Sequence, residues 1–130
     1  KLDAASAEKR RERWQKIAAF AAAQSGRGRI PQVLALPSFA DAVKRAAGCE
    51  LALLPYENEH ALSLRRAVGE AAFETVSIMT GPEGGFSEDE VRLAQEAGMQ
   101  ICTLGPRILR CETAPLCALS AVLYAAGALD

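Results

Sequence analysis

Two glycine-bearing loops constrain the fold of this chain more than any other feature of its sequence. Each lies between a short apolar run and the start of a helix. The first loop is Gly81-Pro82-Glu83-Gly84-Gly85, and the second runs from Gly105 to about Cys111. Short apolar runs that alternate with helices are typical of an α/β fold with a parallel sheet covered on both faces. Because ligand loops in such sheets lie beyond the carboxyl ends of the strands, the sequence predicts that these two loops form one cleft.

The composition of the loops indicates a ligand site built largely from main chain. Glycine lets a backbone approach a ligand closely, and a helix that starts just after a loop leaves amide N–H groups ready for an acceptor. The first loop alone could equally be a strand-to-helix turn that needs glycine for its conformation. It matches neither the G-x-G-x-x-G dinucleotide pattern nor the phosphate-binding P-loop, whose lysine it lacks.

The rest of the chain is predicted from periodicity and cap residues. A chain of 130 residues that is half apolar is long enough for one modest core, so one domain over residues 1–130 is expected. The best-specified helix follows Ser87, which with Glu90 forms a capping box, and Gly98 closes it. The pattern predicts helices over residues 6–24, 37–47, 61–68, 87–98 and 112–127, and strands over residues 32–36, 51–54, 75–80 and 100–104.

Positive charge gathers at the start of the chain although the formal net charge is −1. Residues 1–30 hold eight Lys and Arg against three acidic residues. Such asymmetry indicates either a patch that contacts RNA phosphates or a solvated helix face, and the feature alone does not decide between them. The candidate RNA-binding residues are Arg10, Arg11, Arg13, Arg27 and Arg29.

Cysteine and histidine usage predicts neither a metal site nor a disulfide framework. The four cysteines show no C-x-x-C spacing, and His60 is the one histidine of the sequence. No apolar stretch approaches the roughly 20 residues that a membrane span needs, and no signal-peptide pattern is seen. A cytoplasmic protein with reduced thiols and no membrane partner is therefore expected.

The paired loops resemble a known family. The first loop, together with the segment Leu104-Gly105-Pro106-Arg107-Ile108-Leu109-Arg110-Cys111-Glu112-Thr113-Ala114, is similar to the paired signature of the ribosomal RNA small subunit methyltransferase E family. That family belongs to the SPOUT superfamily of knotted methyltransferases and methylates N3 of a uridine in small-subunit rRNA. Upstream, Arg13-Trp14 and Gln24-Ser25 resemble the arginine-rich segment of the family, so the likeness covers nearly the whole chain.

The resemblance implies an S-adenosylmethionine (SAM) site and names its residues. Backbone around Leu104, Ile108 and Leu109 would enclose the adenine, and Gly81 and Gly85 would line the other wall. The other cofactor-binding residues that it implies are Leu54, Thr80, Gly105 and Thr113.

The catalytic residues are assigned from the chemistry of the reaction that the resemblance implies. Glu112 would accept the N3 proton of uridine if burial raises its pKa, while Arg110 or Arg107 would stabilise negative charge on the uracil oxygens. The alternative for Arg110 and Glu112 is a structural ion pair at a helix start. Cys111 stands where the family usually has threonine, which replaces a hydroxyl by a weaker donor.

The resemblance also implies a trefoil knot, a homodimer, and rRNA or a ribosomal particle as partner. Relative to that family, the chain is expected to lack the first strand-helix-strand of the catalytic domain and an N-terminal barrel domain. Two alternatives remain: a non-catalytic dimerisation or RNA-binding module that retains the fold, and a general nucleotide-binding α/β protein.

Overall fold

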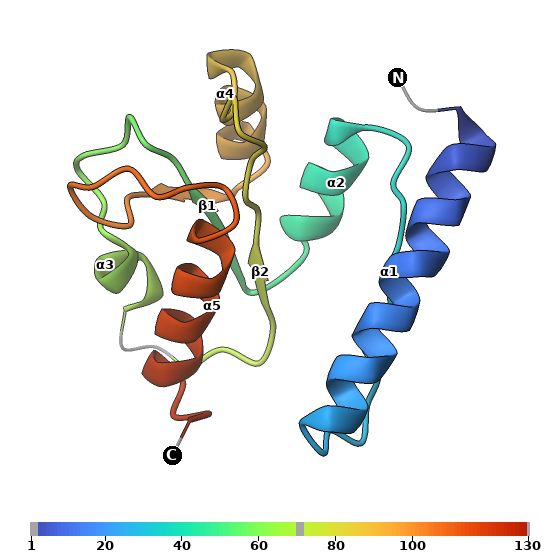
Figure 1. Cartoon of the computed structure of the whole chain (residues 1–130). Helices are drawn as coiled ribbons and strands as arrows, with labels where there is room; N and C mark the ends of the chain where they lie inside the picture. The colour runs from blue at the N-terminus through green and yellow to red at the C-terminus, as the bar shows by residue number, and fades with distance from the viewer. Residues whose placement is uncertain (1–2, 70–71, 130) are drawn as a thin grey trace. The chain divides into compact units, whose positions relative to one another are not determined.

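The computed structural model of the protein describes residues 3–69 and 72–129. These residues belong to two compact units, one ending at Pro37 and the other beginning at Ser38 (Figure 1). The expectation of a single domain over residues 1–130 stays a prediction.

The first unit contains one long helix, α1 (Ala4–Gln24), close to the predicted bounds. Asp3 caps its first turn by accepting the N–H of Ser6 at 2.8 Å. At the other end Gly26 adopts a φ of 69°, and the N–H of Arg27 donates to the C=O of Ala22 at 2.8 Å. This αL glycine with its six-to-one hydrogen bond is a Schellman motif, and it ends the helix where the sequence predicts.

The segment after α1 corrects one prediction. Residues 32–36 form no strand; instead the side chain of Gln15 binds the C=O of Pro31 at 2.9 Å and the N–H of Val33 at 2.8 Å. Strand formation depends on a neighbouring strand more than on residue preference, and here a helix side chain takes up the backbone groups instead. The apolar stripe of α1 is also not buried, since Trp14 is 51% exposed and Ile17 56% exposed.

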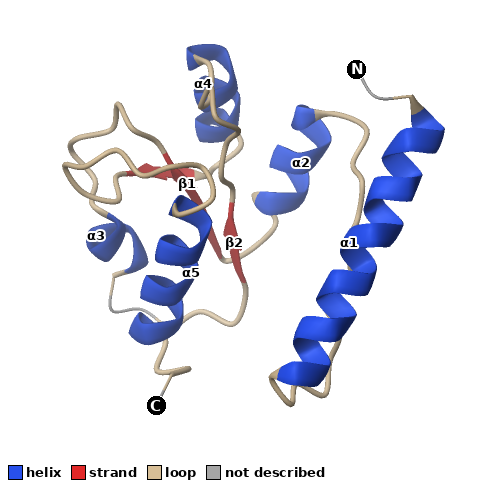
Figure 2. Cartoon of the chain, in the orientation of Figure 1, coloured by secondary structure: helices blue, strands red, loops and turns tan. Residues whose placement is uncertain are grey.

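The second unit is built on a parallel sheet of three strands in the order β2-β1-β3, which confirms the predicted α/β class (Figure 2). The strands are β1 (Leu51–Pro55), β2 (Val76–Ile78) and β3 (Gln100–Cys102). In the register, Leu53 of β1 pairs with Ile78 on one side and with Gln100 on the other. The two outer strands are shorter than predicted.

Helices cover both faces of this sheet. They are α2 (Phe39–Ala46), α3 (Leu64–Val68), α4 (Glu88–Glu96) and α5 (Ala114–Ala125). Ala52 and Leu54 of β1 belong to a core cluster with residues of α2 and α4, whereas Leu51 and Leu53 belong to a second cluster with residues of α3 and α5. This alternation explains why β1 reads as an uninterrupted apolar run.

The ends of α4 confirm the prediction from its cap residues. The hydroxyl of Ser87 accepts the N–H of Glu90, and the Glu90 carboxylate accepts the N–H of Ser87. Gly98, with a φ of 96°, ends the helix and turns the chain into β3. By contrast α3 and α5 both begin later than predicted, α5 after a turn over residues 111–113. Among the described residues, no helix combines the length and apolarity that a membrane crossing requires.

Candidate functional site

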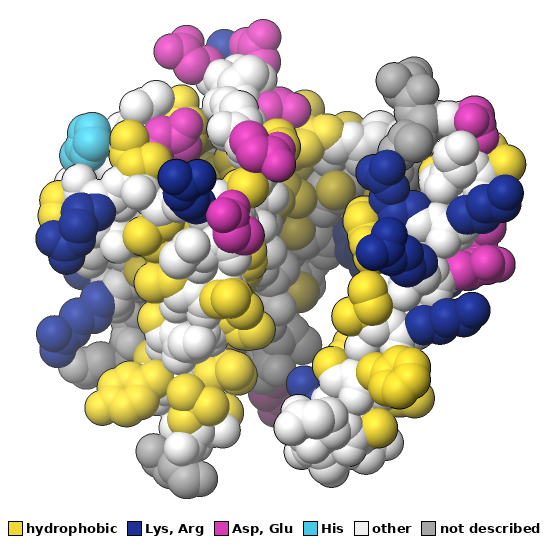
Figure 3. All heavy atoms as spheres, viewed as in Figure 1, with side chains coloured by type: hydrophobic (Ala, Val, Ile, Leu, Met, Phe, Trp, Pro, Cys, Tyr) yellow, Lys and Arg dark blue, Asp and Glu magenta, His cyan; other side chains and the backbone are white. Residues whose placement is uncertain are grey.

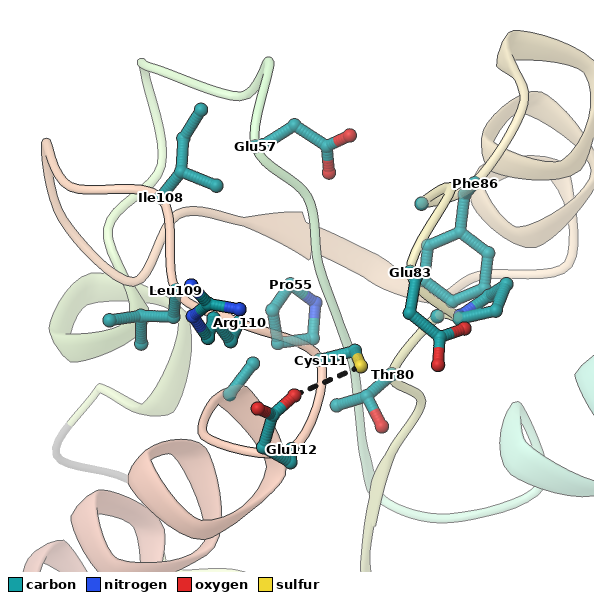
Figure 4. A pocket seen from close by; sticks show the side chains of 14 residues that line it. Pro55, Glu57, Thr80, Glu83, Phe86, Ile108, Leu109, Arg110, Cys111 and Glu112 are labelled. Atoms are coloured by element: carbon teal, nitrogen blue, oxygen red, sulfur yellow. Dashed lines mark hydrogen bonds between the residues drawn. The ribbon is translucent and has the colours of Figure 1, made fainter.

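Two adjoining cavities lie where the segments after the three strands come together. The first has a volume of about 330 Å³ and is bounded by the segment after β1, the first glycine loop and the residues leading into α5 (Figure 4). The second has a volume of about 120 Å³ and lies between the segment after β1 and the second glycine loop. Five residues line both cavities: Pro55, Glu57, Ile108, Leu109 and Ala114. The predicted meeting of the two loops in one hollow is therefore confirmed.

The first glycine loop is closely packed on itself. A Cβ atom added to Gly81 would lie 3.3 Å from the carbonyl carbon of Gly85 and 3.3 Å from the ring of Phe86. Gly85 has a φ of 69°, and a Cβ there would lie only 2.6 Å from Oε1 of Glu57. Glycine is needed at position 85 for its conformation, and its lack of a side chain leaves room for this carboxylate.

The second glycine loop is held by hydrogen bonds rather than by close packing. Gly105 has a φ of 111°, but a Cβ added there would meet nothing within 4 Å. Its N–H donates to the hydroxyl oxygen of Thr103 at 3.1 Å, and the N–H of Thr103 donates to the C=O of Leu62 at 2.8 Å. Leu62 in turn donates its N–H to the Glu59 carboxylate at 3.1 Å. This chain of bonds ties the loop to the segment that follows β1.

Most residues predicted to bind the cofactor line the cavities. Thr80, Gly81 and Gly85 line the first, Leu104 and Gly105 line the second, and Ile108 and Leu109 line both.

Two predicted residues, Leu54 and Thr113, line neither of these cavities. Leu54 is fully buried in the core beneath the site. The N–H of Thr113 donates to the C=O of Arg110 at 2.9 Å in the turn before α5.

The predicted catalytic residues are divided between the cavities. Arg110 and Glu112 line the first, whereas Arg107 lines the second. The expectation that burial raises the pKa of Glu112 is wrong, because its side chain is exposed. Hydrogen bonding to its own backbone N–H, and then to the Cys111 thiol, lowers the pKa of Glu112 below its ordinary value.

The contacts of Arg110 and Glu112 also bear on the alternative of a structural ion pair. Within residues 3–69 and 72–129 the ion pairs are Arg11–Glu8 and Arg92–Asp89, so Arg110 and Glu112 are not paired. Glu112 instead accepts a hydrogen bond from the Cys111 thiol, with 3.2 Å between Sγ and Oε2 (Figure 4). That hydrogen bond is the main cause that raises the pKa of Cys111.

Several lining residues were not predicted from the sequence, and they share one position in the fold. Pro55, Glu57 and His60 follow β1, the central strand, whose carboxyl end faces both cavities. The position of this segment after a buried apolar run was the available signal. Phe86, the last loop residue before the cap of α4, was likewise expected only to support the helix.

The basic residues predicted to contact RNA lie in the first unit. The side chains of Arg10, Arg13, Arg27 and Arg29 are exposed, and basic side chains gather on the visible face of α1 (Figure 3). Arg11 pairs with Glu8 at 2.6 Å, and the Arg10 guanidinium lies 5.9 Å from the centre of the Trp14 ring. Four of the five arginines are therefore outside any ion pair among the described residues.

In the described part of the chain, no three His, Cys, Asp or Glu side chains are grouped so that they could hold a metal ion.

Comparison with known sequences gives consistent matches. Residues 1–123 match the sequence model of a family described as an RNA methyltransferase domain. The chain is 43% identical to "Ribosomal RNA small subunit methyltransferase E" of Bacillus subtilis (strain 168), over 95% of this chain and 50% of that protein. It is 40% identical to the protein of the same name from Synechocystis sp., over 85% of this chain and 37% of that protein. The chain thus spans half or less of these two relatives.

Solved structures show the same likeness. A methyltransferase from Legionella pneumophila, in complex with the bound cofactor SAM, is 35% identical with a TM-score of 0.83, over 96% of this chain and 50% of that one. A "Ribosomal RNA small subunit methyltransferase E" from Neisseria gonorrhoeae, bound to S-adenosyl methionine, is 39% identical with a TM-score of 0.74, over 90% of this chain and 48% of that one.

Proposed function

Because the chain belongs to the RNA methyltransferase domain family, we propose that it forms a SAM-binding unit that methylates N3 of a uridine in small-subunit ribosomal RNA. The observation that carries this proposal is that Gly85 and Leu109, from loops far apart in the sequence, line one cavity. The relatives named for small-subunit rRNA methylation, and the two structural neighbours that hold SAM, support it.

The two cavities fit the two ends of SAM. The smaller, second cavity carries the apolar side chains of Leu104, Ile108 and Leu109, which suit an adenine ring. The larger, first cavity is walled by the first glycine loop, where the absence of a side chain at Gly81 and Gly85 lets a ligand approach the backbone. When bound, SAM supplies an electrophilic methyl group.

Arg110 and Glu112 are the side chains proposed to act on the uridine. The uridine must lose its N3 proton, and the Arg110 guanidinium would stabilise the negative charge that then develops on the uracil oxygens. Glu112, whose pKa is lowered, is ionised at neutral pH and free to accept that proton, although a low pKa makes it a weak base. Arg107 faces the smaller cavity, so the geometry favours Arg110 for the charge-stabilising role.

The proposal extends to the partners of the chain. The exposed arginines of the first unit would contact rRNA phosphates, which position a substrate without reading its sequence. We include in it the trefoil knot, the homodimer and the cytoplasmic location that the family likeness implies.

Calorimetry with SAM and with ATP tests the cofactor assignment. Binding of SAM with no heat from ATP is expected, because the first loop offers no lysine for phosphates. Binding of ATP with no response to SAM would instead identify a general nucleotide-binding protein.

Methyl transfer to unmethylated small ribosomal particles separates an enzyme from a non-catalytic module. The enzyme should label one uridine, and a module none. Glu112→Gln should keep SAM binding and reduce turnover, and Arg110→Ala should reduce turnover further. Loss of SAM binding with either change would show that the residue shapes the cavity rather than the reaction.

A further inference from the structure

The junction between the two cavities has one hydrogen-bonding side chain. Of the five residues that line both cavities, Pro55, Ile108, Leu109 and Ala114 carry purely apolar side chains. The fifth is Glu57, whose carboxylate can accept several hydrogen bonds. A ligand that occupies both cavities at once would therefore find its charged hydrogen-bond acceptor at the junction in Glu57.

The Glu57 carboxylate lies close to the first glycine loop. Oε1 lies 2.6 Å from the position that a Cβ of Gly85 would take. The carboxylate therefore reaches from the segment after β1 to the opposite wall of the cleft (Figure 4). No hydrogen bond or ion pair joins the Glu57 side chain to another residue in the part of the chain that the structure describes, so both oxygens are available to a ligand.

The chemistry of an adenosyl ligand matches this arrangement. With adenine in the smaller cavity and the amino-acid end in the larger one, the ribose lies at the junction. Its two neighbouring hydroxyl groups are hydrogen-bond donors, and a carboxylate can accept from both. Hydrogen bonds to a charged acceptor contribute more than neutral ones.

We propose that Glu57 binds the ribose diol of the adenosyl cofactor and thereby selects ribonucleoside over deoxyribonucleoside ligands. This assignment rests on the proposed function, because it takes the two cavities to hold the two ends of SAM. Glu57 is a binding residue in this scheme and takes no part in the transfer of the methyl group.

The first test uses the wild-type chain and needs no substitution. Adenosine, 2′-deoxyadenosine and 3′-deoxyadenosine compete with radiolabelled SAM in equilibrium dialysis. Each deoxynucleoside is expected to bind about tenfold or more weakly than adenosine, the ratio that corresponds to about 1.4 kcal/mol. Equal competition by all three nucleosides would overturn the assignment.

The second test compares Glu57→Ala with Glu83→Ala, a matched change of a glutamate that lines the first cavity but not the junction. Both side chains are exposed, so circular dichroism should show the same fold for both variants. Glu57→Ala should reduce the preference for adenosine to about twofold or less, whereas Glu83→Ala should keep it. A preference that survives Glu57→Ala would refute the role of Glu57 alone. Failure of the wild-type chain to bind SAM would instead refute the proposed function, and with it this assignment.

Discussion

The two glycine loops bound the same site, yet they need their glycines for different reasons. In the first loop, Gly81 lies against the backbone of Gly85 and the ring of Phe86, and Gly85 combines a positive φ with the nearby Glu57 carboxylate. In the second loop, Gly105 has a positive φ in open space, and hydrogen bonds through Thr103 hold the loop. The first loop thus depends on close contacts of its glycines and on the positive φ of Gly85. The second loop depends on the positive φ of Gly105 and on hydrogen bonds. Substitutions that separate these causes can test the difference.

Gly85→Val should have the largest effect, since it adds a contact to a strained backbone. The positive φ costs about 1–3 kcal/mol for a residue with a side chain, and the new Cβ must also displace Glu57. We expect SAM affinity to fall by more than tenfold in calorimetry. Gly84→Val is the matched control, because Gly84 has no positive φ and a Cβ there meets nothing within 4 Å. An equal loss in both variants would show that neither the positive φ nor the close contact at position 85 matters.

Gly105→Ala should rank second, because it adds strain without a clash. We expect thermal unfolding to report a loss of about 1–2 kcal/mol from the φ of 111°. The affinity for SAM should fall less than in Gly85→Val. An unchanged melting temperature would mean that the second loop relaxes to a conformation open to alanine.

Gly81→Ala should have a smaller effect, since it tests contact alone. The added Cβ would lie 3.3 Å from its nearest neighbours, so the loop must yield by a few tenths of an ångström. The lower entropy of the unfolded alanine chain contributes about 0.4–1 kcal/mol of stability and should largely offset this contact. We therefore expect little change in the melting temperature and a severalfold loss of SAM affinity. A large drop in the melting temperature would show that the loop cannot yield.

Acid should have the smallest of these effects. It should weaken the hydrogen bonds of Glu59 that support the second loop. Hydrogen bonds from the N–H groups of Ala61 and Leu62 lower the pKa of Glu59 below its ordinary value of 4.5 in the folded state. A lowered pKa contributes stability above pH 4.5 that is lost as the pH falls through the folded-state pKa. Thermal unfolding of the wild type and of Glu59→Gln should therefore differ at pH 7 and converge as the pH falls through the folded-state pKa of Glu59. A difference that stays constant with pH would exclude ionised Glu59 as the support.

Local patterns were sufficient to predict the sheet unit. The apolar run at residues 51–54, the capping box at Ser87 and Glu90, and the glycine after α4 each depend on residues close in sequence. Once strands alternate with helices, the parallel sheet and the meeting of the loops at one edge follow from general rules. The individual cofactor-binding residues were named by the family resemblance, and most of them line the cavities.

Features that depend on distant partners were not predictable in this way. The expected strand at residues 32–36 does not form; the side chain of Gln15 instead accepts the N–H of Val33 and donates to the C=O of Pro31. The exposure of Glu112 was not predictable either, because it depends on the turn over residues 111–113. The segment after β1 is a loop at a strand end, but only the structure shows that Glu57 borders both cavities.

The order of strands places the two glycine loops on different outer strands, and only the second loop has further support in the part of the chain that the structure describes. Within the described residues, β1 is flanked on both sides, while β2 and β3 each have one neighbour and carry one glycine loop each. Proteins open locally, most easily at mobile loops and fraying ends. Fraying of β2 would release the first loop and leave the central strand paired with β3. The second loop is held additionally by the hydrogen bonds between Thr103 and residues 62 and 64. Passage of a ligand past the first loop would therefore leave the second loop and the central strand in place.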